Sequence, residues 1–132
     1  MKPLAIIVAD DVPEIQDLIA LWLRARGHAV TCSSSGDATL KQIASGHFDL
    51  VIADVLMPEG DGLEVIRELR QTNSTARVLA ISGGGRYVPA ADCVKLAERL
   101  GADAALLKPF DERQLLSGIA KAMTAPSRRR DG

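Results

Sequence analysis

The sequence predicts an α/β domain built on a doubly wound parallel sheet. Five short apolar runs alternate along the 132 residues with segments whose apolar residues recur at helical spacing. This alternation is typical of parallel strands joined by helices that cover both faces of the sheet. The strand runs are almost entirely apolar, as expected for strands buried on both sides. The chain length fits one domain with its own hydrophobic core.

The first half of the chain contains three of the expected strands. Residues 4–9 form the first strand, and a helix follows Pro13, which is a residue favoured at helix starts. The apolar positions at helical spacing in this helix are Ile15, Leu18, Ile19 and Trp22. Gly27 is its expected stop, residues 28–33 form a weaker second strand, and residues 37–45 form a short second helix. The third strand covers residues 49–53.

The second half repeats the alternation. A third helix begins near Leu63, after a loop punctuated by Pro and Gly, and the fourth strand covers residues 78–81. The fourth helix ends at Gly101, the fifth strand covers residues 104–107, and the last helix follows Asp111, a favourable N-cap. We expect Asp61 and Asp111 to be turn or cap residues. The domain is expected to span residues 1–124, with residues 125–132 as a short, disordered, basic tail.

Composition excludes several classes of protein. A net charge of −1 argues against nucleic-acid binding as the main activity. Cys32 and Cys93 are too few and too far apart for a disulfide framework or a zinc site, so we expect free thiols. No run approaches the roughly 18 apolar residues of a membrane span, and the N-terminal run lacks a signal-peptide pattern. The expectation is a cytoplasmic protein with no membrane association.

Polar residues follow four of the five apolar runs. Asp10 and Asp11 follow the first, and Asp54 follows the third. Ser82 follows the fourth run, and Lys108 follows the last. In an open parallel sheet, ligands bind at the carboxyl ends of the strands, so these side chains are expected to form one site.

The residue types at this site indicate phosphoryl chemistry. Clustered carboxylates raise each other's pKa unless a cation compensates them, and Mg²⁺ prefers oxygen ligands from carboxylates and phosphates. Asp10 and Asp11 are consecutive and suit metal binding, whereas Asp54 stands alone and is the expected nucleophile, forming an aspartyl phosphate. Lys108 is suited to hold a phosphoryl oxygen, and Ser82 to donate a hydrogen bond to another.

The ordered set of motifs resembles the receiver domain of two-component response regulators, in particular the single-domain, chemotaxis-regulator-like members. The resemblance covers about residues 3–124 and rests on the following residues: Asp10-Asp11, Asp54, Met57-Pro58, Asp61-Gly62, Ser82, Gly101-Ala102 and Lys108-Pro109-Phe110. It implies a flavodoxin-like (βα)₅ fold with strand order 2-1-3-4-5. The switch point of that order lies between strands one and three, which end in Asp10-Asp11 and in Asp54.

The resemblance also implies a role for each site residue. Asp54 would accept a phosphoryl group from a histidine of a sensor kinase. Asp11, Asp10 through water, Asp54 and the backbone carbonyl of Leu56 would bind Mg²⁺, and Ser82 and Lys108 would bind the phosphoryl group. The bond between Lys108 and Pro109 is expected to be cis.

The chain departs from the family pattern at two places. The family has Tyr or Phe three residues before the lysine, and here that position is Ala105. A three-glycine run, Gly83 to Gly85, follows Ser82 in an unusually long connection, and Tyr87 in this loop is a candidate to replace the missing aromatic. These departures predict an unusual switching mode.

Three functions compete at this point. The first is a stand-alone response regulator without a DNA-binding or enzymatic output domain. It would be phosphorylated by a sensor histidine kinase or a histidine phosphotransfer protein, and would then switch binding to a downstream protein or pass the phosphoryl group along a phosphorelay. The second is a pseudo-receiver that binds partners without phosphorylation, consistent with Ala105. The third, a haloacid-dehalogenase-like phosphatase, requires a second Asp where this chain has Leu56.

Overall fold

Strands and helices alternate along the whole chain in the computed structural model, which describes residues 2–57, 61–72, 74–83 and 89–126. The strands are β1 (Ala5–Ala9), β2 (Ala29–Ser33), β3 (Leu50–Asp54), β4 (Arg77–Ser82) and β5 (Ala104–Leu107). The helices are α1 (Pro13–Arg24), α2 (Gly36–Ser45), α3 (Gly62–Gln71), α4 (Ala90–Leu100) and α5 (Glu112–Thr124).

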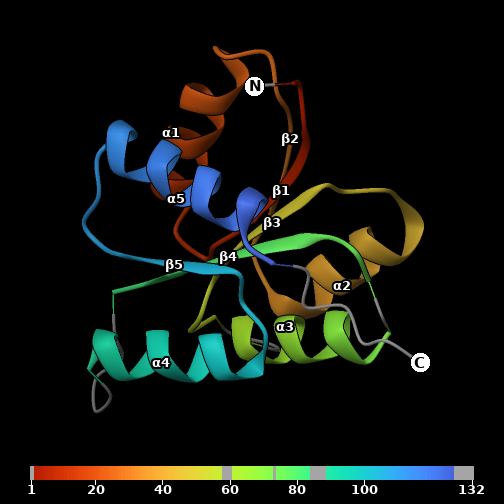
Figure 1. Ribbon diagram of the computed structural model, residues 1–132. Coiled ribbons are helices and arrows are strands. Elements are labelled where there is room, and N and C mark those ends of the chain that lie inside the picture. Colours follow the sequence, from red (N-terminus) through yellow and green to blue (C-terminus); the bar gives the residue numbers. More distant parts are fainter. Residues whose placement is uncertain (1, 58–60, 73, 84–88, 127–132) are drawn as a thin grey trace.

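The sheet has the expected flavodoxin-like topology. Its order is β2-β1-β3-β4-β5, and every neighbouring pair is parallel. Figure 1 shows α1 and α5 on one face of the sheet and α2, α3 and α4 on the other. The doubly wound α/β prediction and the strand order 2-1-3-4-5 are therefore confirmed. The switch point lies between β1 and β3, where the register pairs Ala9 with Ala53.

Each face of the sheet carries its own hydrophobic core. Alternate residues of β1 point to opposite faces, so Ile6 and Val8 pack toward α1 and α5, whereas Ile7 packs toward α2, α3 and α4. β3 contributes to both cores and is buried along its whole length. Burial on both faces explains why the strands read as continuous apolar runs.

The helix α1 is rotated relative to the face that its apolar spacing suggested. Its buried residues are Gln16, Ile19, Ala20 and Leu23. Leu18 is 43% exposed, and Ile15 and Trp22 pack at the margin of the core. The polar side chain of Gln16 takes a buried position because it finds hydrogen-bond partners there, which apolar periodicity alone does not reveal.

The helix ends follow the expected local rules. Asp61 and Asp111 are N-caps, and their carboxylates accept hydrogen bonds from the backbone N–H groups of Glu64 and Gln114. Gly101 ends α4 with a φ of 121°, a backbone conformation that suits glycine. The N-cap position of α4 is Pro89, so Ser82 does not cap that helix.

The structure also bears on the cysteines, the Lys108–Pro109 bond and the possibility of a membrane-spanning helix. Cys32 and Cys93 are free thiols, and the Lys108–Pro109 bond is cis as predicted. Among the described residues, no helix is long and apolar enough to cross a membrane. Some expectations fall outside the described residues. They concern Pro58, residues 84–88, which include Gly84, Gly85 and Tyr87, and residues 127–132 of the predicted tail.

Candidate functional site

The carboxyl ends of four neighbouring strands meet at one edge of the sheet. Asp10 directly follows β1, Asp54 is the last residue of β3, and Ser82 is the last residue of β4. Lys108 directly follows β5, and its backbone N–H donates to the backbone carbonyl of Ser82 at 2.8 Å. Because these strands are adjacent and parallel, residues distant in sequence come together as expected.

Lys108 bridges two buried carboxylates. Its Nζ lies 2.9 Å from Oδ2 of Asp10 and 3.0 Å from Oδ2 of Asp54. The side chain of Asp10 is fully buried, that of Asp54 is 8% exposed, and that of Lys108 is 18% exposed. One ammonium therefore faces two carboxylates in a region with little water, where electrostatic interactions are strong.

Asp11 adds a third carboxylate at the solvent side of this pair. One carboxylate oxygen from each of Asp10, Asp11 and Asp54 lies within 4.8 Å of the others, and Asp11 is exposed. With all groups ionised, three carboxylates and the single ammonium of Lys108 leave an excess of negative charge. A hard divalent cation such as Mg²⁺ fits this donor set, because it prefers oxygen ligands and would offset the excess.

Backbone groups hold the two buried carboxylates in place. Oδ1 of Asp10 accepts the N–H of Val12 at 2.9 Å, and Oδ1 of Asp54 accepts the N–H of Leu56 at 3.2 Å. Each carboxylate thus keeps one oxygen on the turn that follows its strand and presents the other to Lys108. This arrangement fixes which oxygen of Asp54 faces the charged centre of the site.

The titration behaviour reflects this crowding of charges. Burial raises the pKa of Asp54, and the nearby charge of Asp10 raises it further, while the hydrogen bond and charge of Lys108 oppose the rise. Burial by itself lowers the pKa of Lys108, but its contacts with Asp10 and Asp54 outweigh burial and raise it. The ammonium is therefore held charged, although it does not fully compensate the carboxylates.

Gly62, at the start of α3, packs closely against the backbone of Asp54. A Cβ atom at position 62 would lie 2.8 Å from the carbonyl carbon of Asp54 and 3.0 Å from Cα of Val55. Gly62 also donates its N–H to the carbonyl of Val55 at 3.1 Å. The Asp61-Gly62 motif therefore has two local roles, since Asp61 caps α3 and Gly62 lets this helix approach the strand end that carries Asp54.

Ser82, Leu56 and Ala105 lie where the strand assignments place them. Ser82 is buried at the end of β4, and Leu56 is partly exposed two residues beyond Asp54. Ala105 is partly buried in β5 and packs against the core on the side of α4. A methyl group therefore occupies the position where the family pattern has an aromatic ring.

Two features of the site were not expected from the sequence. The first is Gln16, whose side-chain amide donates to the backbone carbonyl of Asp10 and to that of Ser33 at 3.0 Å. The signal that could have revealed it is a polar residue in line with Ala20 and Leu23 on the buried side of α1.

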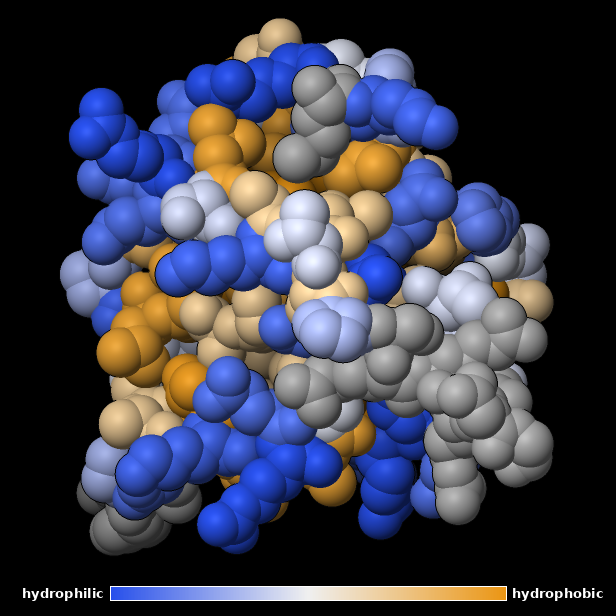
Figure 2. Space-filling view, viewed as in Figure 1, coloured by the Kyte–Doolittle hydropathy of each residue, from blue (hydrophilic) through white to orange (hydrophobic). Residues whose placement is uncertain are grey.

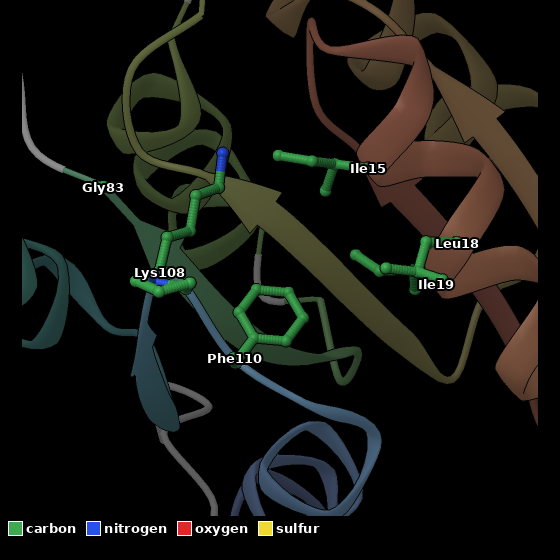
Figure 3. A pocket seen from close by; sticks show the side chains of 7 residues that line it. Ile15, Leu18, Ile19, Gly83, Lys108 and Phe110 are labelled. Atoms are coloured by element: carbon green, nitrogen blue, oxygen red, sulfur yellow. The ribbon is translucent and has the colours of Figure 1, made fainter.

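The second is an apolar pocket of about 450 Å³ beside Lys108. It is lined by Ile15, Leu18, Ile19, Gly83, Lys108, Pro109 and Phe110. Figure 3 shows the side chains of α1 facing the ring of Phe110 across the pocket, with Lys108 along one wall. The stem of Lys108 therefore belongs to both the pocket and the charged site.

Apolar surface also appears near the end of β5. In Figure 2 it lies at the left of the molecule, between hydrophilic surfaces above and below, where β4 and β5 end in Figure 1. Leu107, the last residue of β5, is 48% exposed. The acidic centre is therefore flanked by surface on which apolar side chains are accessible.

Comparison with known proteins gives a family match over most of the chain. The model of the family described as "Response regulator receiver domain" matches residues 6–120. The matched range contains all of the site residues described above.

Individual relatives agree with this match. The chain is 33% identical over 125 residues to the DNA-binding transcriptional regulator NtrC of Azospirillum brasilense, covering 95% of this chain and 25% of the relative. It is 33% identical over 118 residues to the uncharacterized transcriptional regulatory protein YkoG of Bacillus subtilis, covering 89% of this chain and 50% of the relative. The chain thus spans a quarter to a half of these two curated relatives.

A similar solved structure is that of the response regulator protein TrrA from Thermotoga maritima in complex with Mg²⁺-BeF. It superposes with a TM-score of 0.76 at 32% sequence identity, covering 92% of this chain and 99% of that chain.

Proposed function

Since the chain belongs to the response regulator receiver domain family of two-component systems, we propose that it accepts a phosphoryl group on Asp54 in a Mg²⁺-dependent reaction. Receiver domains are signalling modules that interact with histidine kinases, so the donor would be a phosphohistidine of a sensor kinase or of a histidine phosphotransfer protein. The observation that carries the proposal is the ammonium of Lys108, which lies 2.9 Å from Asp10 and 3.0 Å from Asp54 at the strand ends.

In the proposed transfer, a carboxylate oxygen of Asp54 attacks phosphorus. The bond between phosphorus and the donor's imidazole nitrogen breaks, and its electron pair stays on that nitrogen. The product on this chain is an aspartyl phosphate. Oδ2 is the better placed nucleophile, because Oδ1 accepts the N–H of Leu56 while Oδ2 faces the charged centre beside Lys108.

Lys108 and Ser82 would stabilise the transferred group. The ammonium of Lys108 lies within hydrogen-bond distance of Asp54, so it is placed to contact an oxygen of a phosphoryl group attached there. Ser82 is buried at the neighbouring strand end, from which its hydroxyl would donate to a second phosphoryl oxygen.

The acidic cluster would hold the metal ion. The proposed ligands are Asp11, Asp10 through water, Asp54 and the backbone carbonyl of Leu56, in keeping with the preference of Mg²⁺ for carboxylates, carbonyls and water. When bound, the ion would neutralise charge on the phosphoryl oxygens. The fit rests on the three carboxylate oxygens lying within 4.8 Å of one another. The TrrA complex with Mg²⁺-BeF supports Mg²⁺ as the ion, since that protein is 32% identical to this chain.

The pocket beside Lys108 would receive an apolar side chain of the donor protein next to its histidine. The pocket adjoins the acceptor site through the side chain of Lys108. Leu18 lines the pocket from α1 and is exposed, so a partner protein can reach it. We expect Leu18→Asp to slow transfer from the partner kinase while leaving phosphorylation by acetyl phosphate unchanged. An equal loss with both donors would contradict this use of the pocket.

We further propose that the chain works as a response regulator receiver in the cytoplasm. Residues 1–124 would form the domain, because α5 ends at Thr124. Phosphorylation would switch binding to a downstream protein, or the phosphoryl group would pass along a phosphorelay. With Ala105 in place of an aromatic, the switch would not use the family's usual ring movement. A pull-down with and without beryllofluoride tests switching, and partner binding unaffected by Asp54→Asn would instead favour a pseudo-receiver.

Incubation with acetyl phosphate and Mg²⁺, followed by intact-mass measurement, tests the acceptor chemistry. We expect one phosphoryl adduct on the wild type and on Asp37→Asn, a control at an exposed aspartate of α2. Asp54→Asn should show no adduct. Absence of an adduct on the wild type, or its persistence in Asp54→Asn, would overturn the assignment.

A further inference from the structure

Gln16 is a buried polar residue near the start of α1, on the side of the helix that packs against the sheet. It is 9% exposed, and the other buried residues of this helix are Ile19, Ala20 and Leu23. Burying a side-chain amide costs free energy unless its hydrogen bonds are replaced. The position of Gln16 is therefore explained by its partners.

The amide nitrogen of Gln16 joins the ends of two strands. Nε2 contacts the carbonyl oxygen of Asp10, the carbonyl oxygen of Ser33 at 3.0 Å and the hydroxyl of Ser34 at 3.0 Å. The carbonyl of Ser33 also accepts the N–H of Asp10 at 3.0 Å. The peptide groups on both sides of Asp10 are thus held where β1 leaves the sheet.

This contact bears on the placement of Asp11. The carbonyl of Asp10 belongs to the planar peptide that links it to Asp11, so holding that carbonyl sets the direction in which the chain continues. The carboxylate of Asp10 has its own anchors in Val12 and Lys108. Asp11 is exposed, so its approach to Asp54 depends chiefly on where the backbone places it.

We propose that Gln16 is a positioning residue for the metal-binding carboxylates of Asp10 and Asp11. The inference rests on the proposed function for the Mg²⁺ site at Asp10 and Asp11, but not for phosphoryl transfer to Asp54. Gln16 touches neither the ion nor the phosphoryl group and acts through the backbone of Asp10. Loss of a partner that orients metal ligands weakens metal affinity by about 10–100-fold, and we expect about 10-fold here because the action is indirect.

The test compares two variants at the same corner of the fold. Gln16→Met keeps the length of the side chain but removes its donors. Thr39→Val is the matched control, because the hydroxyl of Thr39 contacts Oγ of Ser33 at 2.9 Å and the carbonyl of Ser35 at 2.7 Å without touching Asp10. Both substitutions remove buried hydrogen bonds near the end of β2, but only the first acts on the acidic pair.

Calorimetric titration with Mg²⁺ alone, without a phosphoryl donor, gives the dissociation constant of each folded variant. We expect Gln16→Met to bind about 10-fold more weakly than the wild type and Thr39→Val to bind with unchanged affinity. At saturating Mg²⁺, phosphorylation of Gln16→Met by acetyl phosphate should recover to the wild-type rate, because the defect lies in metal binding.

Two results would overturn the inference: wild-type Mg²⁺ affinity in Gln16→Met, or an equal loss of affinity in Thr39→Val. If Gln16→Met does not fold, Gln16→Asn provides the same comparison, since its amide is too short to reach the carbonyl of Asp10. Failure of the proposed function appears separately, as a wild-type protein that binds Mg²⁺ but forms no phosphoryl adduct.

Discussion

Replacing Lys108 with methionine is expected to destabilise the fold in Mg²⁺-free buffer at neutral pH. The substitution keeps most of the side chain's volume but removes the ammonium that lies 2.9 Å from Asp10 and 3.0 Å from Asp54. Two carboxylates with little or no exposure then lose their shared counterion. Uncompensated buried charge of this kind is among the more costly defects a single substitution creates.

The size of the effect follows from the burial of the groups. Removing one partner of a buried ion pair costs about 3–5 kcal/mol. Lys108 retains 18% exposure, and the exposed Asp11 leaves the site open to solvent, so screening reduces this figure to about 2–3 kcal/mol. For a domain of this size, the loss corresponds to a fall in Tm of about 10 °C.

Urea unfolding followed by circular dichroism and by the fluorescence of Trp22 measures the change. Lys121→Met, at an exposed lysine of α5, serves as the control and should stay within about 0.5 kcal/mol of the wild type. Adding Asp54→Asn to Lys108→Met should recover a large part of the loss, because it removes one of the unpaired charges. Mg²⁺ should stabilise Lys108→Met, by about 2.7 kcal/mol at a concentration 100-fold above its dissociation constant.

Two results would contradict this expectation: a Lys108→Met variant as stable as Lys121→Met, or no effect of Asp54→Asn in the Lys108→Met background. Either result would mean that the carboxylates do not depend on the ammonium for compensation in the folded protein.

Three further predictions concern Asp54, Gly62 and His28. Asp54→Asn alone should stabilise the Mg²⁺-free protein at pH 7, because burial and the charge of Asp10 disfavour the ionised carboxylate. Folding raises the pKa of Asp54, so ionisation of this side chain disfavours the folded state. The stability gained by Asp54→Asn in urea unfolding should therefore vanish below pH 3.8, the ordinary pKa of the group. Gly62→Ala should lower the free energy of unfolding by about 3 kcal/mol, since the new Cβ meets the backbone of Asp54. In the control Gly46→Ala, the nearest atom lies 3.4 Å from the new Cβ, so the loss should be less than about 1 kcal/mol. Similar urea midpoints for the two variants would contradict this. His28 accepts the N–H of Leu4 at 3.0 Å, and burial lowers its pKa, so its contribution to stability is present above pH 6.5 and lost as pH falls below that value. The wild type should therefore lose more stability than His28→Ala between pH 7 and pH 5, and parallel pH profiles would count against this role.

Much of the fold could be predicted because its signals are local. Each apolar run became a strand within one or two residues of its expected limits, and Asp111 and Gly101 bounded α5 and α4 as expected. The meeting of Asp10, Asp54 and Lys108 was also predictable, because parallel strands bring their carboxyl ends to one edge.

The remaining features depend on packing that spacing does not reveal. The rotation of α1 exposes Leu18 and buries Gln16, because the amide finds backbone carbonyls at the ends of β1 and β2. Similarly, the guanidinium of Arg70 in α3 reaches Oδ2 of Asp103 at 2.9 Å and the carbonyl of Gly101 at 2.9 Å. Such contacts join elements far apart in sequence, so they emerge only once the elements are placed in three dimensions.

Direct identification of the phosphorylated residue tests whether Asp54 is the phosphoryl acceptor. Treating the acetyl-phosphate-labelled protein with borohydride reduces an acyl phosphate to the alcohol, and peptide mass spectrometry then locates the modified aspartate. We expect modification at Asp54 alone, dependent on Mg²⁺ and lost when EDTA is present during labelling. Modification at Asp10 or Asp11 instead, or labelling that is unaffected by EDTA, would contradict it.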